Sequence, residues 1–330
     1  MKFRTEIDIP GKEKIITPET IIFSAGSCFA GNIAAKLKRL KFNISSNPFG
    51  VLFNPLSLLN MTEVLTGKIK LSEDDLVFHN GLWNSFYHNS EFSGEDKAST
   101  QKLIDQTIQR ESKQFSNSDI FIFTFGTSFV YFWKESGFPV SNCHKIPSHK
   151  FERRMLTLEE NIEAIEKIIV NILSINSKAK LILTVSPVRH LKDGLHQNQL
   201  SKASLLLAVD HIIHKYENVD YFPAYEILLD DLRDYRFYDV DLTHPSNEAI
   251  EYIWEKFQTC YFTPAADEFA KEMNELATSL EHRILHPGSQ NSKDFAISRL
   301  KLIGNLNQKY PNLNFEKEEE HFNKILNFSG

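Results

Sequence analysis

Residues 24–32 read Ser-Ala-Gly-Ser-Cys-Phe-Ala-Gly-Asn and follow the apolar run Ile-Ile-Phe at 21–23. After them, from 33 to 40, isoleucine and leucine recur at helical spacing. This order predicts a strand, a turn of small residues and a helix. Such a turn presents backbone N–H groups and one small hydroxyl side chain, that of Ser27, at the carboxyl end of a strand. Open α/β sheets bind their ligands at that edge.

Four further segments are expected to be strands of the same sheet, and helical segments separate most of them. The strands begin near residues 43, 120, 181 and 219. Those near 120 and 181 are short, β-rich apolar runs, as in buried parallel strands. Helices are expected at 55–65, 97–115, 158–175, 199–216 and 247–257, and hairpins at 76–87 and 129–139. This alternation predicts an α/β protein with a parallel sheet.

The composition is that of a globular protein with a substantial core. Of 330 residues, 42% are hydrophobic and 24% are charged. The net charge of −6 provides no basic footprint, so we expect no nucleic-acid partner. The charged N-terminus lacks an apolar signal core, and no run approaches the ~18 apolar residues of a membrane helix. We therefore expect a cytoplasmic protein with no membrane partner, and no sequence feature indicates an oligomeric state.

Ser27 needs a base before it can act as a nucleophile, and the base needs a carboxylate to fix its tautomer. The segment Asp-Leu-Thr-His at 241–244 offers both groups. An aspartate three residues before a histidine can reach its Nδ1 within one turn and leave Nε2 to face the nucleophile. The serine turn and this segment together predict a catalytic triad of Ser27, His244 and Asp241.

Each of these residues also has a simpler interpretation. Ser27 could merely cap the helix that follows it, and His244, which precedes a proline, could be a loop histidine. Cys28 is the rival nucleophile, but a residue after the turn should point into the packing of the helix. The pairing of the serine turn with the Asp-x-x-His segment favours the triad over these alternatives.

Neither a metal ion nor a cofactor is expected. His88, His144 and His149 share no ligand-like spacing with a carboxylate or a cysteine. The three cysteines, at 28, 143 and 260, indicate neither a disulfide framework nor a zinc knuckle. Residues 26–31 lack both the lysine of a P-loop and the glycine spacing of a dinucleotide-binding turn.

Residues 26–30, Gly-Ser-Cys-Phe-Ala, spell the name motif of the GSCFA family, a branch of the SGNH (GDSL-like) hydrolase superfamily. The sequence resembles this family from about residue 17 to residue 256. The other motifs that carry the resemblance lie at 47–50, 125–128, 142–145, 186–190, 231–238 and 241–246. It implies a flavodoxin-like, three-layer α/β/α fold with a mostly parallel five-stranded sheet. It also implies that Ser27 is the nucleophile, His244 the base and Asp241 its orienter.

The resemblance further implies an oxyanion hole with three donors. In the superfamily these are the nucleophile's own N–H, a glycine N–H after the second strand and an asparagine side chain after the third. Gly50 fits the glycine. Ser128 stands where the asparagine is expected, so we expect Ser128, Thr127 or, from the following hairpin, Asn142 to donate instead.

Three further residues are expected to line the site or support it. Arg189 and His190 follow the carboxyl end of a parallel strand, so their side chains should reach the active edge. Arg189 would bind an anionic group of the substrate or pair with an aspartate in the 231–234 segment. His144 is expected to have a structural or substrate-lining role.

The function predicted is that of a serine-dependent acyl-ester hydrolase, acting on a small-molecule or carbohydrate ester such as an acetate. One alternative is an O-acyltransferase that uses the same triad on a carbohydrate or another small acceptor. Another is a catalytically weak or inactive binding protein of the same fold. Polar helices without strands follow residue 262, so we expect a catalytic domain at 1–261 and a helical extension at 262–330 that packs on it.

Overall fold

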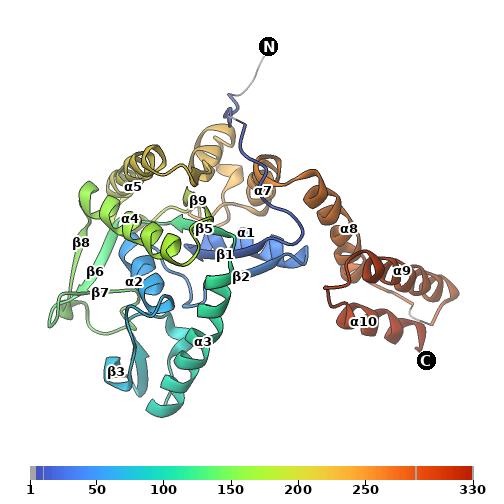
Figure 1. The fold of residues 1–330 in the computed structure, drawn as a ribbon, viewed down its shortest axis with the longest axis horizontal. Helices are drawn as coiled ribbons and strands as arrows, with labels where there is room; N and C mark the ends of the chain where they lie inside the picture. Colours follow the sequence, from blue (N-terminus) through green and yellow to red (C-terminus); the bar gives the residue numbers. More distant parts are fainter. Residues whose placement is uncertain (1–4, 10, 287, 329–330) are drawn as a thin grey trace.

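The computed structural model describes residues 5–9, 11–286 and 288–328, and its centre is one parallel sheet (Figure 1). The five strands are β1 (Ile21–Gly26), β2 (Asn43–Ser46), β5 (Ile120–Phe125), β9 (Lys180–Val185) and β10 (Val219–Tyr221). Their order across the sheet is β10-β9-β5-β1-β2, and every neighbouring pair is parallel. This is the doubly wound order of flavodoxin-like folds, with the switch point between β1 and β5. The predicted fold class is confirmed.

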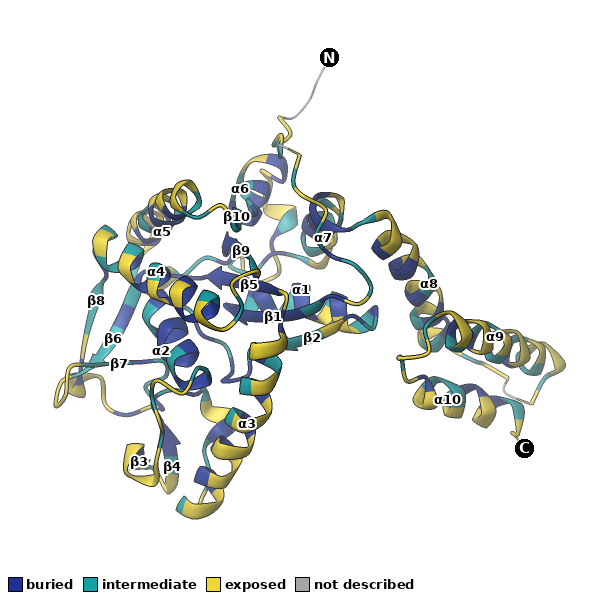
Figure 2. Cartoon of the chain, in the orientation of Figure 1, coloured by how far each residue is buried: buried dark blue, intermediate teal, exposed yellow. Residues whose placement is uncertain are grey.

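Helices cover both faces of the sheet and make three layers (Figure 2). On one face lie α1 (Cys28–Arg39) and α7 (Asn247–Tyr261), and on the other lie α2 (Pro55–Leu65), α3 (Lys97–Asn117), α4 (Leu158–Ile175) and α5 (Leu195–Lys215). Side chains alternate along a strand, so Ile22 packs toward α1 and α7 whereas Phe23 packs toward the second group. All of β5 is buried, as its apolar sequence predicts.

Two small antiparallel sheets are inserted between the central strands. The first is the hairpin of β3 (Leu76–His79) and β4 (Leu82–Ser85), as predicted. The second contains the predicted hairpin of β6 (Phe129–Trp133) and β7 (Phe138–Val140), but β6 also pairs with an unpredicted strand, β8 (Phe151–Met155). The charged residues of β8 hide it from a search for apolar runs. Its Arg153 and Arg154 lie over aromatic rings of β6, those of Phe129 and Phe132, at 4.4 and 4.6 Å.

Short helical turns connect the larger elements. They are η1 (Glu73–Asp75), η2 (Ser90–Phe92), η3 (Ser148–Lys150), η4 (Leu191–Asp193), α6 (Ala224–Glu226), η5 (Ile227–Asp231) and η6 (Tyr235–Phe237). Two of them, η4 and η6, lie in the loops that reach the carboxyl edge of the sheet. The predicted helix at 199–216 is α5, which begins four residues earlier, at Leu195, after Gly194 at φ +87°.

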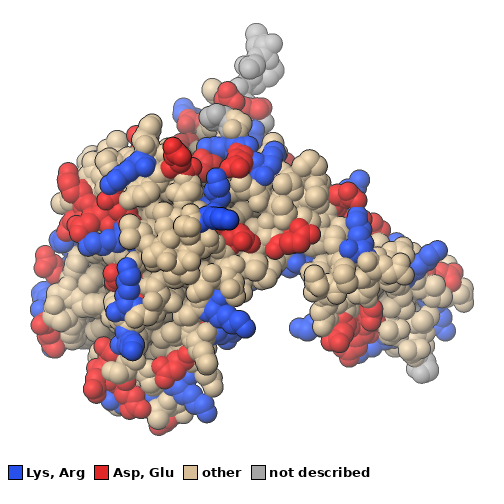
Figure 3. Space-filling view, in the orientation of Figure 1, with Lys and Arg blue, Asp and Glu red and all other residues tan. Residues whose placement is uncertain are grey.

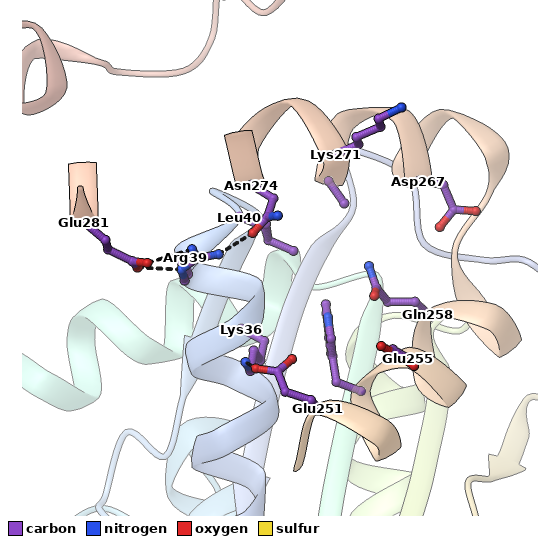
Figure 4. A pocket seen from close by; sticks show the side chains of 12 residues that line it. Lys36, Arg39, Leu40, Glu251, Glu255, Gln258, Asp267, Lys271, Asn274 and Glu281 are labelled. Atoms are coloured by element: carbon purple, nitrogen blue, oxygen red, sulfur yellow. Dashed lines mark hydrogen bonds and ion pairs between the residues drawn. The ribbon is translucent and has the colours of Figure 1, made fainter. Parts of the chain in front are cut away.

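Three helices follow the sheet: α8 (Pro264–Glu281), α9 (Gln290–Lys309) and α10 (Glu316–Leu326). Phe269 and Ala270 of α8 are buried in the core shared with α1, whereas α9 and α10 lie farther out (Figure 1). Arg39 at the end of α1 donates to both carboxylate oxygens of Glu281, at 2.9 and 3.1 Å, and to Asn274. These contacts border a cavity of about 570 Å³ between α1, α7 and α8 (Figure 4).

The surface carries both signs of charge. On the face drawn in Figure 3, lysines and arginines are interspersed with aspartates and glutamates. None of the helices within the described ranges combines the length and the apolar character needed to cross a membrane.

Candidate active site

Ser27 lies in the turn between β1 and α1, with 1% of its surface exposed. It occupies the N-cap position of α1, with φ −66° and ψ 175°, but its side chain makes no capping hydrogen bond. Its Oγ is buried without a hydrogen-bond partner among the described residues. Buried hydroxyl groups are nearly always hydrogen-bonded, so this unpartnered hydroxyl is an exception. The capping interpretation accounts for the position of Ser27 but not for its hydroxyl.

Asp241 and His244 make the contact that their spacing predicts. The carboxylate Oδ2 lies 2.6 Å from the imidazole Nδ1. The other oxygen, Oδ1, accepts the backbone N–H groups of Thr243 and His244 at 2.8 and 2.9 Å. Bonds from the backbone of His244 and the side chain of Thr243 are the main reasons why the pKa of Asp241 is well below its usual range. The carboxylate is therefore ionised and holds the imidazole from one side.

The turn that holds this pair is tightly bent. Leu242 has φ +55°, a left-handed conformation that branched residues rarely adopt. Immediately after it, Ser246 caps α7 by accepting the N–H of Ala249. The turn thus enters α7 at a fixed position on the carboxyl edge of the sheet. No hydrogen bond joins Ser27 Oγ to His244 here, and catalytic hydrogen bonds often form only when substrate is bound.

The loop after β9 is bonded to the same turn. The backbone N–H of Arg189 donates to Thr243 O at 3.0 Å. The guanidinium of Arg189 lies 4.2 Å from the ring centre of Tyr238 and donates to Leu242 O at 3.5 Å. Within the described ranges it forms no ion pair with the aspartates of 231–234, one of the two roles expected for it. Its side chain instead forms one wall of a cavity of about 170 Å³ beside the turn.

His190, the next residue, lies near Ser27. Its ring meets the ring of Phe53 edge to face at 5.5 Å, and its Nε2 is buried without a partner in the described part of the chain. A Cβ added to Gly126 would lie 3.1 Å from this Nε2 and 3.3 Å from Ser27 Cβ. Both side chains therefore pack closely against Gly126, where a larger residue would displace them.

Two backbone donors expected in the oxyanion hole already have partners. The N–H of Ser27 donates to Thr124 O at 3.0 Å, and the N–H of Gly50 donates to Asn47 O at 2.8 Å. The side chain of Asn89 lies over Gly50 so closely that a Cβ there would be 2.0 Å from its Cγ. Asn89 was not foreseen from the sequence, since it comes from the inserted segment after β4.

The side chains expected to replace the missing asparagine are turned toward α5. Thr127 Oγ1 lies 3.0 Å from Ser201 Oγ, and Ser128 Oγ donates to Ser201 O at 3.0 Å. The backbone N–H of Ser128 donates to the same serine hydroxyl at 2.7 Å. Ser201 thus fastens this loop to the helix and takes both side chains away from Ser27.

Asn142 and His144 lie together against the inserted sheets. Asn142 Oδ1 accepts the N–H of His144 at 2.8 Å, and its Nδ2 donates to Ser90 Oγ at 3.5 Å. The Nε2 of His144 lies 2.7 Å from Ser85 O. These bonds agree with a structural role for His144 and leave Asn142 with partners other than Ser27. Within the described residues no group of three histidine, cysteine or acidic side chains is placed to hold a metal ion.

Comparison with known families identifies the chain. The model of the GSCFA family matches residues 21–257, and that of the GSCFA domain protein, C-terminal domain, matches residues 273–327. The chain belongs to the GSCFA family. The resemblance carried by the motif at 26–30 is confirmed. A search of curated proteins finds no significant match.

Two solved structures are remotely similar to this GSCFA chain. A carbohydrate esterase family 3 protein from Talaromyces cellulolyticus is 8% identical, over 77% of this chain and 98% of its own, with a TM-score of 0.37. An acetyl xylan esterase from the rumen bacterium Butyrivibrio proteoclasticus is 11% identical, over 73% of this chain and 62% of its own, with a TM-score of 0.38. Likenesses this remote assign neither a substrate nor a residue.

Like Asn89, Lys202 was not predicted from the sequence of this GSCFA chain to lie near the site. Its side chain is fully buried in α5, and its Nζ donates to Gly126 O at 2.7 Å and to Ser186 O at 2.6 Å. Burial lowers its pKa to about 7. These two carbonyls end β5 and β9, so one ammonium group fixes both loops that approach Ser27. The sequence feature that could have indicated its burial is its position three residues before Leu205, on the buried face of α5.

Proposed function

We propose that this GSCFA chain is a serine-dependent ester hydrolase in which Ser27 is the nucleophile, His244 the general base and Asp241 its orienter. The observation that carries the proposal is the buried, unpartnered hydroxyl of Ser27 at the carboxyl end of β1. The contact of the ionised Asp241 with His244 supports it, because this pair would supply the base and the orienting carboxylate that a serine nucleophile needs.

The reaction follows from the roles of these groups. Ser27 Oγ forms a bond to the ester carbonyl carbon while its proton passes to His244 Nε2, and the carbonyl π electrons move to oxygen. The carbonyl then re-forms and the C–O bond to the alcohol breaks, with the proton of His244 going to the departing alcohol. Water attacks the acyl-serine in the same way and releases the acid. Asp241 stabilises the imidazolium in both halves.

Cys28 is a weaker candidate nucleophile. Burial raises the pKa of its thiol, which disfavours the reactive thiolate. It also lies inside the first turn of α1, whereas Ser27 precedes the helix. Its position makes Cys28→Ala a suitable neighbouring control for substitutions of Ser27.

The substrate class we propose is a small acyl ester of a sugar or a similar alcohol. The cavity beside the Asp241–His244 turn is about 170 Å³ and has Tyr235, Tyr238 and Arg189 among its lining residues. A tyrosine ring with an exposed face suits the apolar face and hydroxyl groups of a sugar ring. Tyr235 is 64% exposed, so its ring is accessible to such a group.

A fluorophosphonate probe tests the nucleophile, because it reacts with activated serines by displacement of fluoride. Wild type and Cys28→Ala should be labelled and should release 4-nitrophenol from 4-nitrophenyl acetate. Ser27→Ala and His244→Ala should do neither, and mass spectrometry should locate the label on Ser27. Equal labelling of wild type and Ser27→Ala would overturn the proposal. An acyltransferase would show slow hydrolysis that accelerates when an acceptor alcohol is added.

A further inference from the structure

The proposed reaction leaves an oxyanion to be stabilised, and the donors expected for it are already engaged. The N–H groups of Ser27 and Gly50 have backbone partners, and Thr127 and Ser128 bond to Ser201. A hydrolase of this kind needs preorganised donors aimed at the oxygen on which charge develops. The missing oxyanion donor should therefore be a group beside Ser27 with an unpartnered polar atom.

We infer that His190 supplies an oxyanion-hole hydrogen bond from its Nε2–H to the carbonyl oxygen of the ester attacked by Ser27. This inference rests on the proposed function. Two atoms carry it: Nε2 of His190 and Oγ of Ser27 are both buried and both lack partners among the residues described. Their side chains are neighbours, because His190 Nε2 and Ser27 Cβ would lie 3.1 and 3.3 Å from a Cβ on Gly126. The carbonyl oxygen of an ester attacked by Ser27 would give the imidazole its missing partner.

The surroundings of His190 keep it neutral and favour negative charge nearby. Its pKa is lowered to about 4, mainly by burial and to a smaller extent by Lys202, His244 and Arg153, against an opposing effect of Asp193. A neutral imidazole with its proton on Nε2 donates without first having to lose charge. The neighbouring positive charges that disfavour protonation of His190 also attract an oxyanion.

His190 is held more firmly than its place in a loop suggests. Its backbone N–H donates to Asn198 Oδ1 at 2.9 Å, and Asn198 is buried in α5. Three residues further on, Asp193 in η4 accepts both arms of the Arg153 guanidinium from β8. The loop is thus fastened on both sides of the ring, and a preorganised donor is what an oxyanion hole needs.

His190 is less suited to be the base. A catalytic imidazole needs a carboxylate on its other nitrogen, and Asp193, the carboxylate that acts on its pKa, is already paired with Arg153. A group whose pKa is lowered to about 4 is also a weak proton acceptor at neutral pH. His244, with Asp241 on Nδ1, has the support that His190 lacks.

Substitution of His190 tests the inference through the rate of fluorophosphonate labelling and through 4-nitrophenyl acetate kinetics. His190→Ala should lower kcat and the labelling rate by about 10²–10³-fold, as removal of one oxyanion donor does, with KM changed less than threefold. The shape of the pH–rate profile should remain that of wild type, because the base is untouched. His190→Gln, which keeps an N–H at a similar reach, should recover at least tenfold over His190→Ala.

Controls separate this inference from the proposed function and from misfolding. His214→Ala removes an exposed histidine of α5 and should behave as wild type, and thermal unfolding of each variant reports on the fold. If Ser27→Ala abolishes labelling but His190→Ala is within threefold of wild type, the inference is wrong and the triad stands. A His190→Gln no better than His190→Ala also overturns it. A wild type that does not label removes the proposed function itself, and this inference with it.

Discussion

The backbone N–H of Arg189 donates to the carbonyl oxygen of Thr243 at 3.0 Å. The first residue follows β9 and the second precedes α7, and each is followed directly by a histidine. The bond therefore joins the segments that carry His190 and His244. His190 packs against Gly126 near Ser27, and His244 is held by Asp241. Two histidines with different neighbours can then serve different roles at one serine.

Gly126→Ala should impair catalysis, because the new Cβ would press on both His190 and Ser27. The φ of Gly126 is not in the left-handed region, so alanine fits its backbone, but the new Cβ would lie 3.1 Å from His190 Nε2 and 3.3 Å from Ser27 Cβ. We expect kcat/KM for 4-nitrophenyl acetate to fall at least tenfold in Gly126→Ala, about 1.4 kcal/mol or more of transition-state stabilisation. Gly304→Ala, in open space on α9, is the control and should keep full activity. Unchanged kinetics in Gly126→Ala would mean that catalysis does not depend on the placement of these two side chains.

Lys202 should make the stability of the protein depend on pH. Its pKa is about 7 in the folded state, against about 10.4 for an unperturbed lysine. Between these values the unfolded chain binds a proton that the folded chain does not, so the free energy of unfolding rises with pH, by at most about 1.4 kcal/mol per unit. Lys202→Met removes that rise, and it also removes two hydrogen bonds, a loss that does not vary with pH.

Urea denaturation at several pH values from 6 to 10 measures this effect. The unfolding free energy of wild type minus that of Lys202→Met should increase as pH rises above 7. Lys178→Met, at an exposed position, should instead differ from wild type by a constant amount. A constant difference for Lys202→Met as well would show that Lys202 keeps an ordinary pKa.

Asp241→Asn should leave the fold intact and remove most of the activity. An amide cannot hold the imidazole in the tautomer that frees Nε2 to accept a proton, so kcat should fall by about 10²–10⁴-fold. Because the pKa of Asp241 is lowered in the folded state, its contribution to stability is present above its unfolded value and is lost only as pH falls through the folded value. Asp239→Asn, whose carboxylate accepts the N–H of Val240, is the neighbouring control and should retain activity. Activity of Asp241→Asn near that of wild type would exclude the orienting role.

The sequence predicted what depends on local pattern. Apolar runs located β1, β5 and β9, and the spacing of Asp241 and His244 predicted a contact within one turn, because both features are set by residues close in the chain. β8 was missed since its arginines are stabilised by aromatic rings of β6, which pattern alone does not show. The engagement of Ser128 was missed for a similar reason, because its partner Ser201 lies 73 residues away. An oxyanion hole is built from such distant contacts, so local sequence pattern does not predict its donors.

Arg189 should affect binding of the alcohol portion of the substrate more than the chemical step. Its side chain lines the cavity of about 170 Å³ and stacks on Tyr238, whereas its backbone N–H makes the bond to Thr243. Arg189→Ala removes the first contact and keeps the second. A hydrogen bond from the guanidinium to a sugar hydroxyl would contribute about 1 kcal/mol, so KM for an acetylated hexoside should rise about fivefold, with kcat changed less than twofold. KM for 4-nitrophenyl acetate should stay constant, as should all constants of Arg236→Ala, whose side chain lies over Phe237 outside this cavity. An equal rise of KM for both esters would place the sugar elsewhere, because a contact with a sugar cannot act on a substrate that contains none.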